Sequence, residues 1–318
     1  MSSRVFVSAP LPGDALTVLR ARAEVVLADT GRGMTDPRFV DAAGTYDAVI
    51  TLLTDRVDAC VLARASRVRI VANVAVGVDN IDREACKARG IAVTNTPGVL
   101  TEATADLAFA LLLAAARRVG EGERLVRQGL FVGWTPTLLI GARVHGATLG
   151  IVGFGRIGQA MARRARGFGM RLLYAQPRPL APELERALGA THVSVPALFA
   201  EADMVSLHCP LTGETRGLVD AGRLATMKPG SILVNTARGA CVDEAALAHS
   251  LEHGPLAAAG LDVFEDEPRV NRALIRLPNV VLTPHIGSAD RTTREAMAAM
   301  AVSNVIAVLD GREPPNRA

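Results

Sequence analysis

A glycine-rich loop is the segment of this chain whose residue types and spacing most clearly indicate chemistry. The loop is Gly153-Phe154-Gly155-Arg156-Ile157-Gly158, and it stands between an apolar, strand-like run and a segment with helical periodicity. In this setting the three glycines permit a tight turn, close approach of the backbone to a phosphate, and close packing of the helix on the strand. The start of the helix adds unpaired N–H donors and a favourable dipole. The loop therefore predicts a site for the pyrophosphate of a dinucleotide.

Three further segments place reactive side chains directly after apolar strands. Arg238 stands beside Gly239, and its guanidinium could hold a carboxylate through two parallel charge-assisted hydrogen bonds. An acidic segment at 262–267 follows the next strand, and His285 follows the last. Imidazole is the natural acid or base near neutral pH, and a neighbouring carboxylate would hold one tautomer of the ring. Taken singly, Arg238 could instead form a surface ion pair, and His285 and the acidic segment could be structural.

Short apolar strands that alternate with helical segments must position these side chains, because ligands of open parallel sheets bind at the carboxyl ends of the strands. This alternation, with few aromatic and many aliphatic residues, predicts an α/β protein with two Rossmann-like, doubly wound parallel sheets. The expected strands of the first series are 4–8, 48–53, 69–74 and 91–95. The expected strands of the second series are 149–152, 171–174, 204–207, 231–234, 258–262 and 280–282.

The chain, with 318 residues, is long enough for two domains. The strand pattern breaks at Thr96-Pro97-Gly98, and an apolar helix follows. The C-terminal helix has an apolar stripe at 302–309, which it could bury by packing back on the first sheet. The expected domains are a discontinuous substrate-binding domain starting at 1–99, an inserted dinucleotide-binding domain at 100–286, and a returning helix in 287–318.

Composition argues against several classes of protein. Lys and Arg number 35 against 32 Asp and Glu, without a basic run, so a nucleic-acid surface is not expected. The longest apolar run, 107–116, is too short to cross a bilayer, and the N-terminus lacks signal-peptide features. The 4 cysteines form no C-x-x-C pair, which argues against a disulfide framework. We therefore expect a cytoplasmic protein that binds neither nucleic acid nor membrane.

One short motif points to a different class of enzyme. His249-Ser250-Leu251-Glu252-His253 matches the H-x-x-E-H pattern of some zinc peptidases, in which two histidines share one helical face. A zinc peptidase therefore stays an alternative, although nothing else in the chain is dedicated to a metal. The expectation is that the protein holds no metal.

Four segments, taken in order and spacing, resemble the signatures of the D-isomer-specific 2-hydroxyacid dehydrogenase family. They are 152–158, 235–239, 260–268 and 284–288, and they span much of the chain. The resemblance implies the insertion of a dinucleotide domain into a flavodoxin-like substrate domain. It also implies a catalytic trio in which Arg238 grips the substrate carboxylate and carbonyl, His285 is the general acid/base, and Glu267 hydrogen-bonds and tunes His285.

The resemblance further implies two sets of binding residues. Asp262 would meet the nicotinamide carboxamide, backbone N–H groups of Val76 and Gly77 would bind the substrate carboxylate, and Leu53 would line the substrate pocket. The implied cofactor-binding residues are Gly153, Gly155, Arg156, Ile157, Gly158, Gln176, Arg178, Pro210, Thr236 and Asp262. The implied substrate-binding residues are Leu53, Val76, Gly77, Trp134, Arg238 and Ser288.

Two segments resemble the glyoxylate/hydroxypyruvate reductases within this family. They are Gly133-Trp134-Thr135-Pro136 and Gln176-Pro177-Arg178-Pro179. In that subgroup the first segment lies on an arm that reaches the neighbouring subunit, which implies a homodimer with the arm and helix 107–116 in its interface. Trp134 would then cap the active site of the partner, or else anchor the interface without touching substrate. Closure of the two domains is expected to exclude water from the reaction.

The choice of dinucleotide depends on the residues beyond the glycine loop. An acidic residue about 20 positions further on usually holds the ribose 2′-hydroxyl of NAD. Here Gln176 stands 18 residues after Gly158, and Arg178 could pair with a 2′-phosphate. This pattern predicts that NADPH is preferred and that NAD is a possible second cofactor. The alternative is that Arg178 is only an exposed loop charge.

The resemblance therefore implies reduction of small 2-keto acids, such as glyoxylate and hydroxypyruvate, to D-2-hydroxy acids. A family member acting on 2-ketogluconate, 3-phosphoglycerate or phosphite is an alternative, although the loop 74–78 has no basic residue for a phosphorylated substrate. A dinucleotide-sensing, corepressor-like protein is another alternative. Turnover of glyoxylate would distinguish an enzyme from such a sensor.

Overall fold

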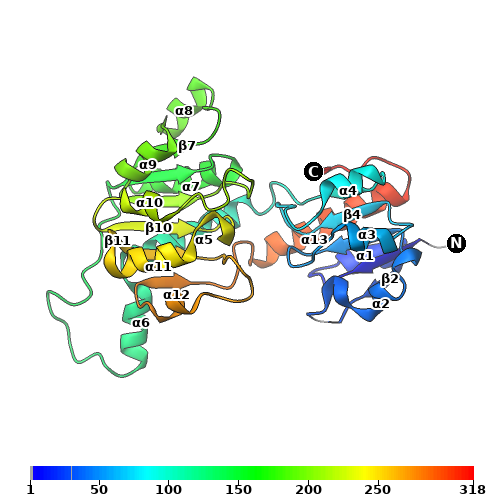
Figure 1. Ribbon diagram of the computed structural model, residues 1–318, viewed down its shortest axis with the longest axis horizontal. Coiled ribbons are helices and arrows are strands. Elements are labelled where there is room, and N and C mark those ends of the chain that lie inside the picture. The colour runs from blue at the N-terminus through cyan, green and yellow to red at the C-terminus, as the bar shows by residue number, and fades with distance from the viewer. Residues whose placement is uncertain (1–2, 30) are drawn as a thin grey trace. The chain divides into compact units, whose positions relative to one another are not determined.

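Residues 3–29 and 31–318 are described by the computed structural model, and the chain divides into two compact units (Figure 1). The first unit comprises Met1–Leu100 and Ser288–Ala318, and the second comprises Thr101–Gly287. The expected domain limits, after residues 99 and 286, lie one residue from the limits of these units. Each unit is a parallel sheet covered by helices on both faces.

The first unit contains a five-stranded parallel sheet in the order β2-β1-β3-β4-β5. This order is flavodoxin-like, as the resemblance implies. The strands are β1 (Arg4–Val7), β2 (Glu24–Leu27), β3 (Ala48–Thr51), β4 (Ile70–Asn73) and β5 (Ala92–Thr94). The prediction missed β2, because this edge strand has no fully buried residue and therefore lacks the continuous apolar run of a central strand.

Helices cover both faces of this sheet. One face carries α1 (Ala15–Arg20) and α13 (Arg291–Leu309), whereas the other is covered by several short helices. These short helices are η1 (Gly33–Thr35), α2 (Pro37–Val40), η2 (Ala43–Thr45), α3 (Ala59–Arg64) and α4 (Arg83–Ala88).

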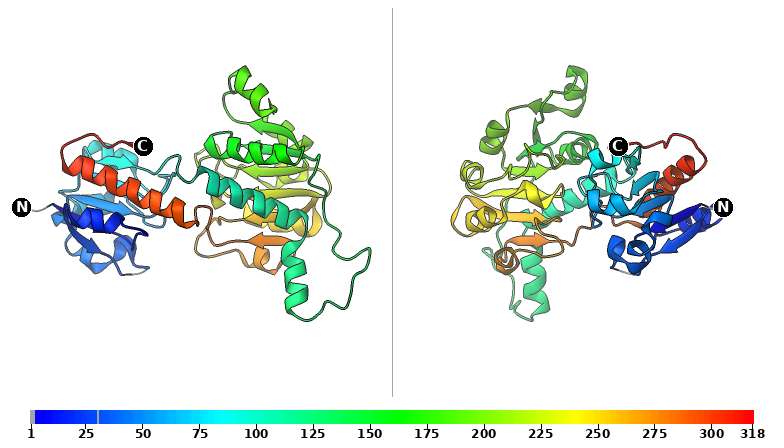
Figure 2. Two further views of the ribbon diagram at one scale, coloured as in Figure 1. Left: turned by 180° about the vertical axis from the view of Figure 1, so that it is seen from behind. Right: turned by 45° about the vertical axis from the view of Figure 1, so that its right-hand side comes forward.

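Helix α13, coloured orange to red, runs along the sheet in Figure 2. The Asp290 carboxylate caps its N-terminus by accepting the Thr293 N–H at 2.7 Å. Val302 and Val305, from the apolar stripe, are buried together with Ile50 of β3 and residues of β1 and β4. The last helix of the chain therefore completes the core of the unit that the first hundred residues begin.

The second unit contains a seven-stranded parallel sheet in the order β12-β11-β10-β9-β6-β7-β8. Six of these strands follow the Rossmann order, and β12 is added at one edge. The strands are β6 (Thr148–Val152), β7 (Arg171–Ala175), β8 (Ala190–His192), β9 (Met204–Leu207), β10 (Ser231–Asn235), β11 (Leu256–Leu261) and β12 (Val280–Leu282). Six strands were expected, and β8 was missed because it is a 3-residue edge strand with Thr191 exposed.

Two layers of helices cover this sheet (Figure 2). The helices on one face are α5 (Thr101–Ala116), α7 (Arg156–Gly167) and α8 (Pro182–Leu188). The helices on the other face are α9 (Val195–Glu201), α10 (Ala221–Ala225), α11 (Glu244–His253) and α12 (Arg272–Arg276), and the 3-10 turn η3 (Gly239–Cys241) follows β10. Most apolar side chains of α5 are buried against its own sheet, so only part of this helix remains for another subunit.

An extended arm follows α6 (Val119–Arg127) and stands away from the sheet of its own unit (Figure 1). Its apolar side chains are exposed: Val132 is 100% and Trp134 79% accessible. Among the described residues, no helix has the length and apolarity needed to cross a membrane.

Candidate functional site

In the second unit, the expected catalytic and cofactor-binding residues lie on loops. These loops follow the carboxyl ends of the strands. Strand β6 lies between β7 and β9, so the chain runs outward in both directions from β6. Ligands of such sheets bind where the strand order reverses. The glycine loop follows β6 at this point, and the segment Cys209-Pro210 follows β9 beside it.

Each of the three positions in the loop is glycine for a different structural reason. Gly153 has a φ of +84°, and a Cβ there would lie 2.5 Å from the Cys209 nitrogen. A Cβ at Gly158 would lie 2.3 Å from the Gly153 carbonyl oxygen, so this glycine lets α7 pack closely on the loop. A Cβ at Gly155 would meet no atom of the protein within 4 Å. Two glycines therefore serve the fold, and the third leaves open space above the backbone.

The donors around this open space fit a pyrophosphate. Gly155 is the N-cap of α7 and provides no side-chain cap. The N–H groups of Arg156 and Ile157, in the first turn, have no intrahelical partner. Thr236, after β10, has a buried Oγ1 without a hydrogen-bond partner among the described residues. Pro210 is exposed beside the loop, next to Cys209. The arrangement suits a negatively charged group at a helix N-terminus.

Arg238 is held by the turn that follows β10. The buried Asn235 side chain accepts the Ala237 N–H at 3.0 Å and donates to the Arg238 carbonyl oxygen at 2.9 Å. A Cβ at Gly239 would lie 1.9 Å from the Phe264 carbonyl carbon, so the loops after β10 and β11 meet backbone to backbone. The turn therefore places a half-buried arginine next to the acidic segment.

His285 and Glu267 form a pair across the loops after β12 and β11. Nδ1 of His285 lies 2.8 Å from Oε2 of Glu267, and Oε1 of Glu267 accepts the Phe264 N–H at 2.9 Å. Because a carboxylate accepts, Nδ1 carries the hydrogen and Nε2 is left for a substrate. Burial alone would raise the pKa of Glu267, but the hydrogen bonds from His285 and Phe264, together with the nearby charges of His285 and Arg238, lower that pKa.

Asp262 braces the loop that carries His285. Its Oδ1 accepts the Thr283 hydroxyl at 2.6 Å and the Ile286 N–H at 2.8 Å, and its Oδ2 accepts the Gly287 N–H at 2.8 Å. His285 has a φ of +52°, which a residue with a side chain rarely adopts. Burial raises the pKa of Asp262. The residue that the resemblance assigns to the nicotinamide thus already holds the backbone of the expected acid/base.

Gln176 and Arg178 lie in the loop after β7. Oε1 of Gln176 accepts the Phe154 N–H at 3.2 Å, and its Nε2 donates to the Arg178 carbonyl oxygen at 2.7 Å. Gln176 therefore links the glycine loop to the segment that carries Arg178. The Arg178 side chain is exposed.

The loop after β4 of the first unit is the segment expected to bind the substrate carboxylate. Among residues 3–29 and 31–318, no group accepts a hydrogen bond from the N–H of Val76 or Gly77. The side chain of Asn73 donates to the Gly77 carbonyl oxygen at 2.8 Å, and that of Asn80 donates to the Leu52 carbonyl oxygen at 3.0 Å. These two amides shape the loop and fix the backbone before the half-buried Leu53.

Several shaping residues were not identified from the sequence. Asn235, Asn73 and Asn80 each order a turn through their side-chain amides. An asparagine at a strand end before a turn is a recognisable signal, because its side chain competes for backbone groups. The brace by Asp262, in contrast, joins residues more than 20 positions apart and has no local signal.

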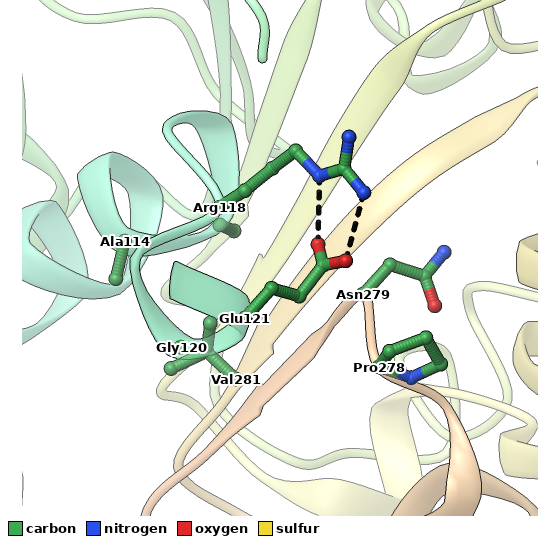
Figure 3. Close-up of a pocket in the computed structure, with 8 residues that line it drawn as sticks. Ala114, Arg118, Gly120, Glu121, Pro278, Asn279 and Val281 are labelled. Carbon is green, nitrogen blue, oxygen red and sulfur yellow. Dashed lines mark hydrogen bonds and ion pairs between the residues drawn. The ribbon is translucent and has the colours of Figure 1, made fainter. Parts of the chain in front are cut away.

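Two other regions lie apart from this chemistry. The pocket in Figure 3 lies between the α5–α6 corner and β12, where Arg118 pairs with Glu121 at 2.8 Å, and none of the expected catalytic residues lines it. The rings of His249 and His253 meet edge to face on α11, but the described part of the chain holds no group of His, Cys, Asp or Glu arranged for a metal ion. Trp134 is exposed on the arm, and Ser288 begins the returning part of the first unit.

Comparison with known proteins identifies the family of this chain. A family model described as the NAD-binding domain of D-isomer-specific 2-hydroxyacid dehydrogenases matches residues 109–287, more than half of the chain. Glyoxylate reductases of Thermococcus litoralis and Pyrococcus furiosus are each 48% identical over 99% of this chain, and the matches cover 96% and 95% of those proteins.

Solved structures show the same architecture. The TT0316 protein from Thermus thermophilus is 50% identical, with 99% of both chains covered and a TM-score of 0.90. An NADPH-dependent glyoxylate/hydroxypyruvate reductase from Sinorhizobium meliloti, solved with NADP and malonate, is 35% identical, with 100% of this chain and 97% of that chain covered and a TM-score of 0.89. With these matches, the two parallel sheets and the full-length similarity show that the chain belongs to the D-isomer-specific 2-hydroxyacid dehydrogenase family.

Proposed function

We propose that this oxidoreductase reduces glyoxylate and hydroxypyruvate to the corresponding 2-hydroxy acids, with NADPH as the preferred cofactor. The observation that carries the proposal is the His285–Glu267 pair, with its 2.8 Å hydrogen bond, which lies at the carboxyl ends of the strands, as the glycine loop does. The names of the relatives from Thermococcus litoralis and Pyrococcus furiosus support the substrate class.

Each residue of the trio has a defined part in this reaction. The bound dinucleotide supplies the hydride that the carbonyl carbon accepts. Glu267 holds the Nδ1–H of His285, so the charged ring donates its second proton from Nε2 to the carbonyl oxygen. Arg238 holds the substrate carboxylate and places positive charge where negative charge develops on that oxygen.

The loop 74–78 of the first unit, which is expected to bind the substrate carboxylate, favours a small substrate. The N–H groups of Val76 and Gly77 can both donate to one carboxylate, because they have no acceptor in the described structure. Residues 74–78 include no Lys or Arg that could neutralise an additional phosphate group. This composition favours glyoxylate and hydroxypyruvate over a phosphorylated substrate.

Steady-state kinetics with glyoxylate and hydroxypyruvate test the function. The unmodified protein should reduce both, whereas a dinucleotide sensor would not turn them over. Arg238→Lys should lower kcat/KM by about 100-fold, or about 2.7 kcal/mol of transition-state binding, because an ammonium cannot reproduce a guanidinium fork. Arg269→Lys, on the exposed surface of the neighbouring loop, is the control and should stay within about twofold of the unmodified enzyme. Normal efficiency of Arg238→Lys would return Arg238 to a structural role.

The pH dependence tests the pairing of His285 with Glu267. Reduction needs a protonated imidazole, so activity falls as pH rises. Glu267→Gln removes the negative charge that stabilises the imidazolium, and the falling limb should move to lower pH. Glu265→Gln, an exposed neighbour, should leave the profile in place. An unchanged profile of kcat/KM for Glu267→Gln would contradict the pairing.

Substitutions of the glycines test the cofactor site. Gly155→Ala fills space that the protein leaves open, so it should weaken NADPH binding at least about tenfold while stability falls by no more than about 1 kcal/mol, the cost of an alanine at an N-cap. Gly158→Ala should lower the stability, because its Cβ overlaps the Gly153 carbonyl oxygen. Gly167→Ala, at the other end of α7 and without steric conflict, should affect neither property. Normal NADPH affinity in Gly155→Ala would place the pyrophosphate elsewhere.

Arg178 tests the cofactor preference. We expect NADPH to exceed NADH in kcat/KM by at least about tenfold, corresponding to about 1.4 kcal/mol. Arg178→Ala should remove most of this difference by weakening NADPH use, with NADH use nearly unchanged. Arg186→Ala removes an exposed charge from the nearby helix α8 and should keep the preference. Equal efficiencies with the two cofactors in the unmodified enzyme would contradict the assignment.

The arm supports a homodimer. Five apolar side chains of the arm are more than half exposed, and so many on one segment are usually covered by a partner: Leu130, Phe131, Val132, Trp134 and Ile140. Sedimentation at micromolar concentration should show a dimer, and Val132→Asp should shift it toward monomer because a charge would enter the interface. Ile275→Asp, at an exposed apolar position on α12, should not do so. A monomeric unmodified protein would remove the case for Trp134 acting on a partner's active site.

A further inference from the structure

We propose that His192 is a positioning residue for cofactor specificity, which holds residues 176–180 in the orientation that a 2′-phosphate requires. We call residues 176–180 the specificity loop. The inference rests on the proposed NADPH preference and adds to it a residue of β8, the edge strand that the sequence pattern missed.

His192 makes a directed contact with the start of the specificity loop. It is the register partner of Tyr174 on β7, and the two rings lie 5.1 Å apart. Its Nε2 is 3.0 Å from the Gln176 carbonyl oxygen. Because a carbonyl oxygen only accepts, Nε2 carries the hydrogen and donates it. This donor is present in the matching neutral tautomer and in the charged ring, so the contact does not depend on protonation.

The side chain of Gln176 forms hydrogen bonds with two other segments, and the anchor at its carbonyl group helps to hold both. Its Oε1 accepts the Phe154 N–H of the glycine loop, and its Nε2 donates to the Arg178 carbonyl oxygen, at 3.2 and 2.7 Å. The backbone of Gln176 is thus fixed by His192, whereas its side chain fixes the backbone of Arg178. Replacing His192 would release the Gln176 carbonyl group and loosen the hold on the Arg178 backbone, without replacing a residue proposed to contact the cofactor.

The other end of the specificity loop is anchored by Tyr174. Its hydroxyl accepts the Leu180 N–H at 2.8 Å and donates to Glu185 at 2.5 Å, and its side chain is fully buried. Pro177 and Pro179 further restrict the backbone between the two anchors. Arg178 is therefore an exposed side chain on a restrained backbone, which lowers the entropy lost when it binds a phosphate.

Nucleotide fragments test this role without turnover. Titration calorimetry with adenosine 2′,5′-bisphosphate and with AMP measures the contribution of the 2′-phosphate. His192→Phe retains an aromatic ring beside Tyr174 and loses the donor, so it should weaken binding of the bisphosphate about three- to tenfold, the effect of one hydrogen bond. Its affinity for AMP should stay within about twofold.

Conservative variants separate the hydrogen bond from general stability. His192→Gln keeps an N–H donor and should restore most of the affinity for the bisphosphate. Thr191→Val alters the exposed neighbour on the same strand and should change neither affinity. If His192→Phe does not fold, His192→Met, which also lacks a donor, takes its place. Thermal melts of all variants identify any loss of nucleotide affinity that comes from unfolding.

Kinetics provide the second readout and distinguish the two proposals. In His192→Phe, kcat/KM should fall with NADPH by the same factor as the bisphosphate affinity and stay unchanged with NADH. Equal losses with both nucleotides, or no loss, would overturn the role of His192. If Arg178→Ala removes the NADPH preference and His192→Phe keeps it, only this inference fails. If the unmodified enzyme does not distinguish the bisphosphate from AMP, both proposals fail.

Discussion

Backbone contact between neighbouring loops is the constraint on which the proposed site depends. The segments after β6 and β9 meet at Gly153, and those after β10 and β11 meet at Gly239, where a Cβ would lie within 2.5 and 1.9 Å of the facing backbone. A side chain at either position would force the loops apart. The second contact brings Arg238 into the field of Glu267, whose pKa it helps to lower. The chemistry is therefore arranged by residues that have no side chain.

Two carboxylates, the buried Asp262 and the half-buried Glu267, then stabilise the expected acid/base. Charge is unfavourable in the interior unless hydrogen bonds compensate for lost solvation. Asp262 meets this condition with three donors from the loop 283–287, and Glu267 meets it with His285 and a backbone N–H. The left-handed backbone of His285 is strained, and these hydrogen bonds offset the strain. One carboxylate thus fixes the backbone of the histidine, and the other fixes its ring.

The sequence predicted the parts of this protein that follow local rules. The glycine loop was recognisable because a strand and a helix flank it, and the fold because buried strands alternate with helices. The strands β2 and β8 were missed, since edge strands are short and partly polar. Contacts such as Asp262 to Thr283 and His192 to Gln176 depend on how distant loops fold together. Gln176 was identified by its spacing, whereas its bracing hydrogen bonds became visible only in three dimensions.

The discontinuity of the first unit has a consequence for its biosynthesis. The ribosome produces all five strands of the first sheet before it produces α13, which covers one face of that sheet. Until then, Val7, Ile50 and Ile70 lack part of their apolar cover, and the whole second unit is translated in between. Because the second unit is continuous in sequence, it can fold as the chain emerges. The nascent N-terminal segment must therefore stay soluble and unaggregated until the last helix leaves the exit tunnel.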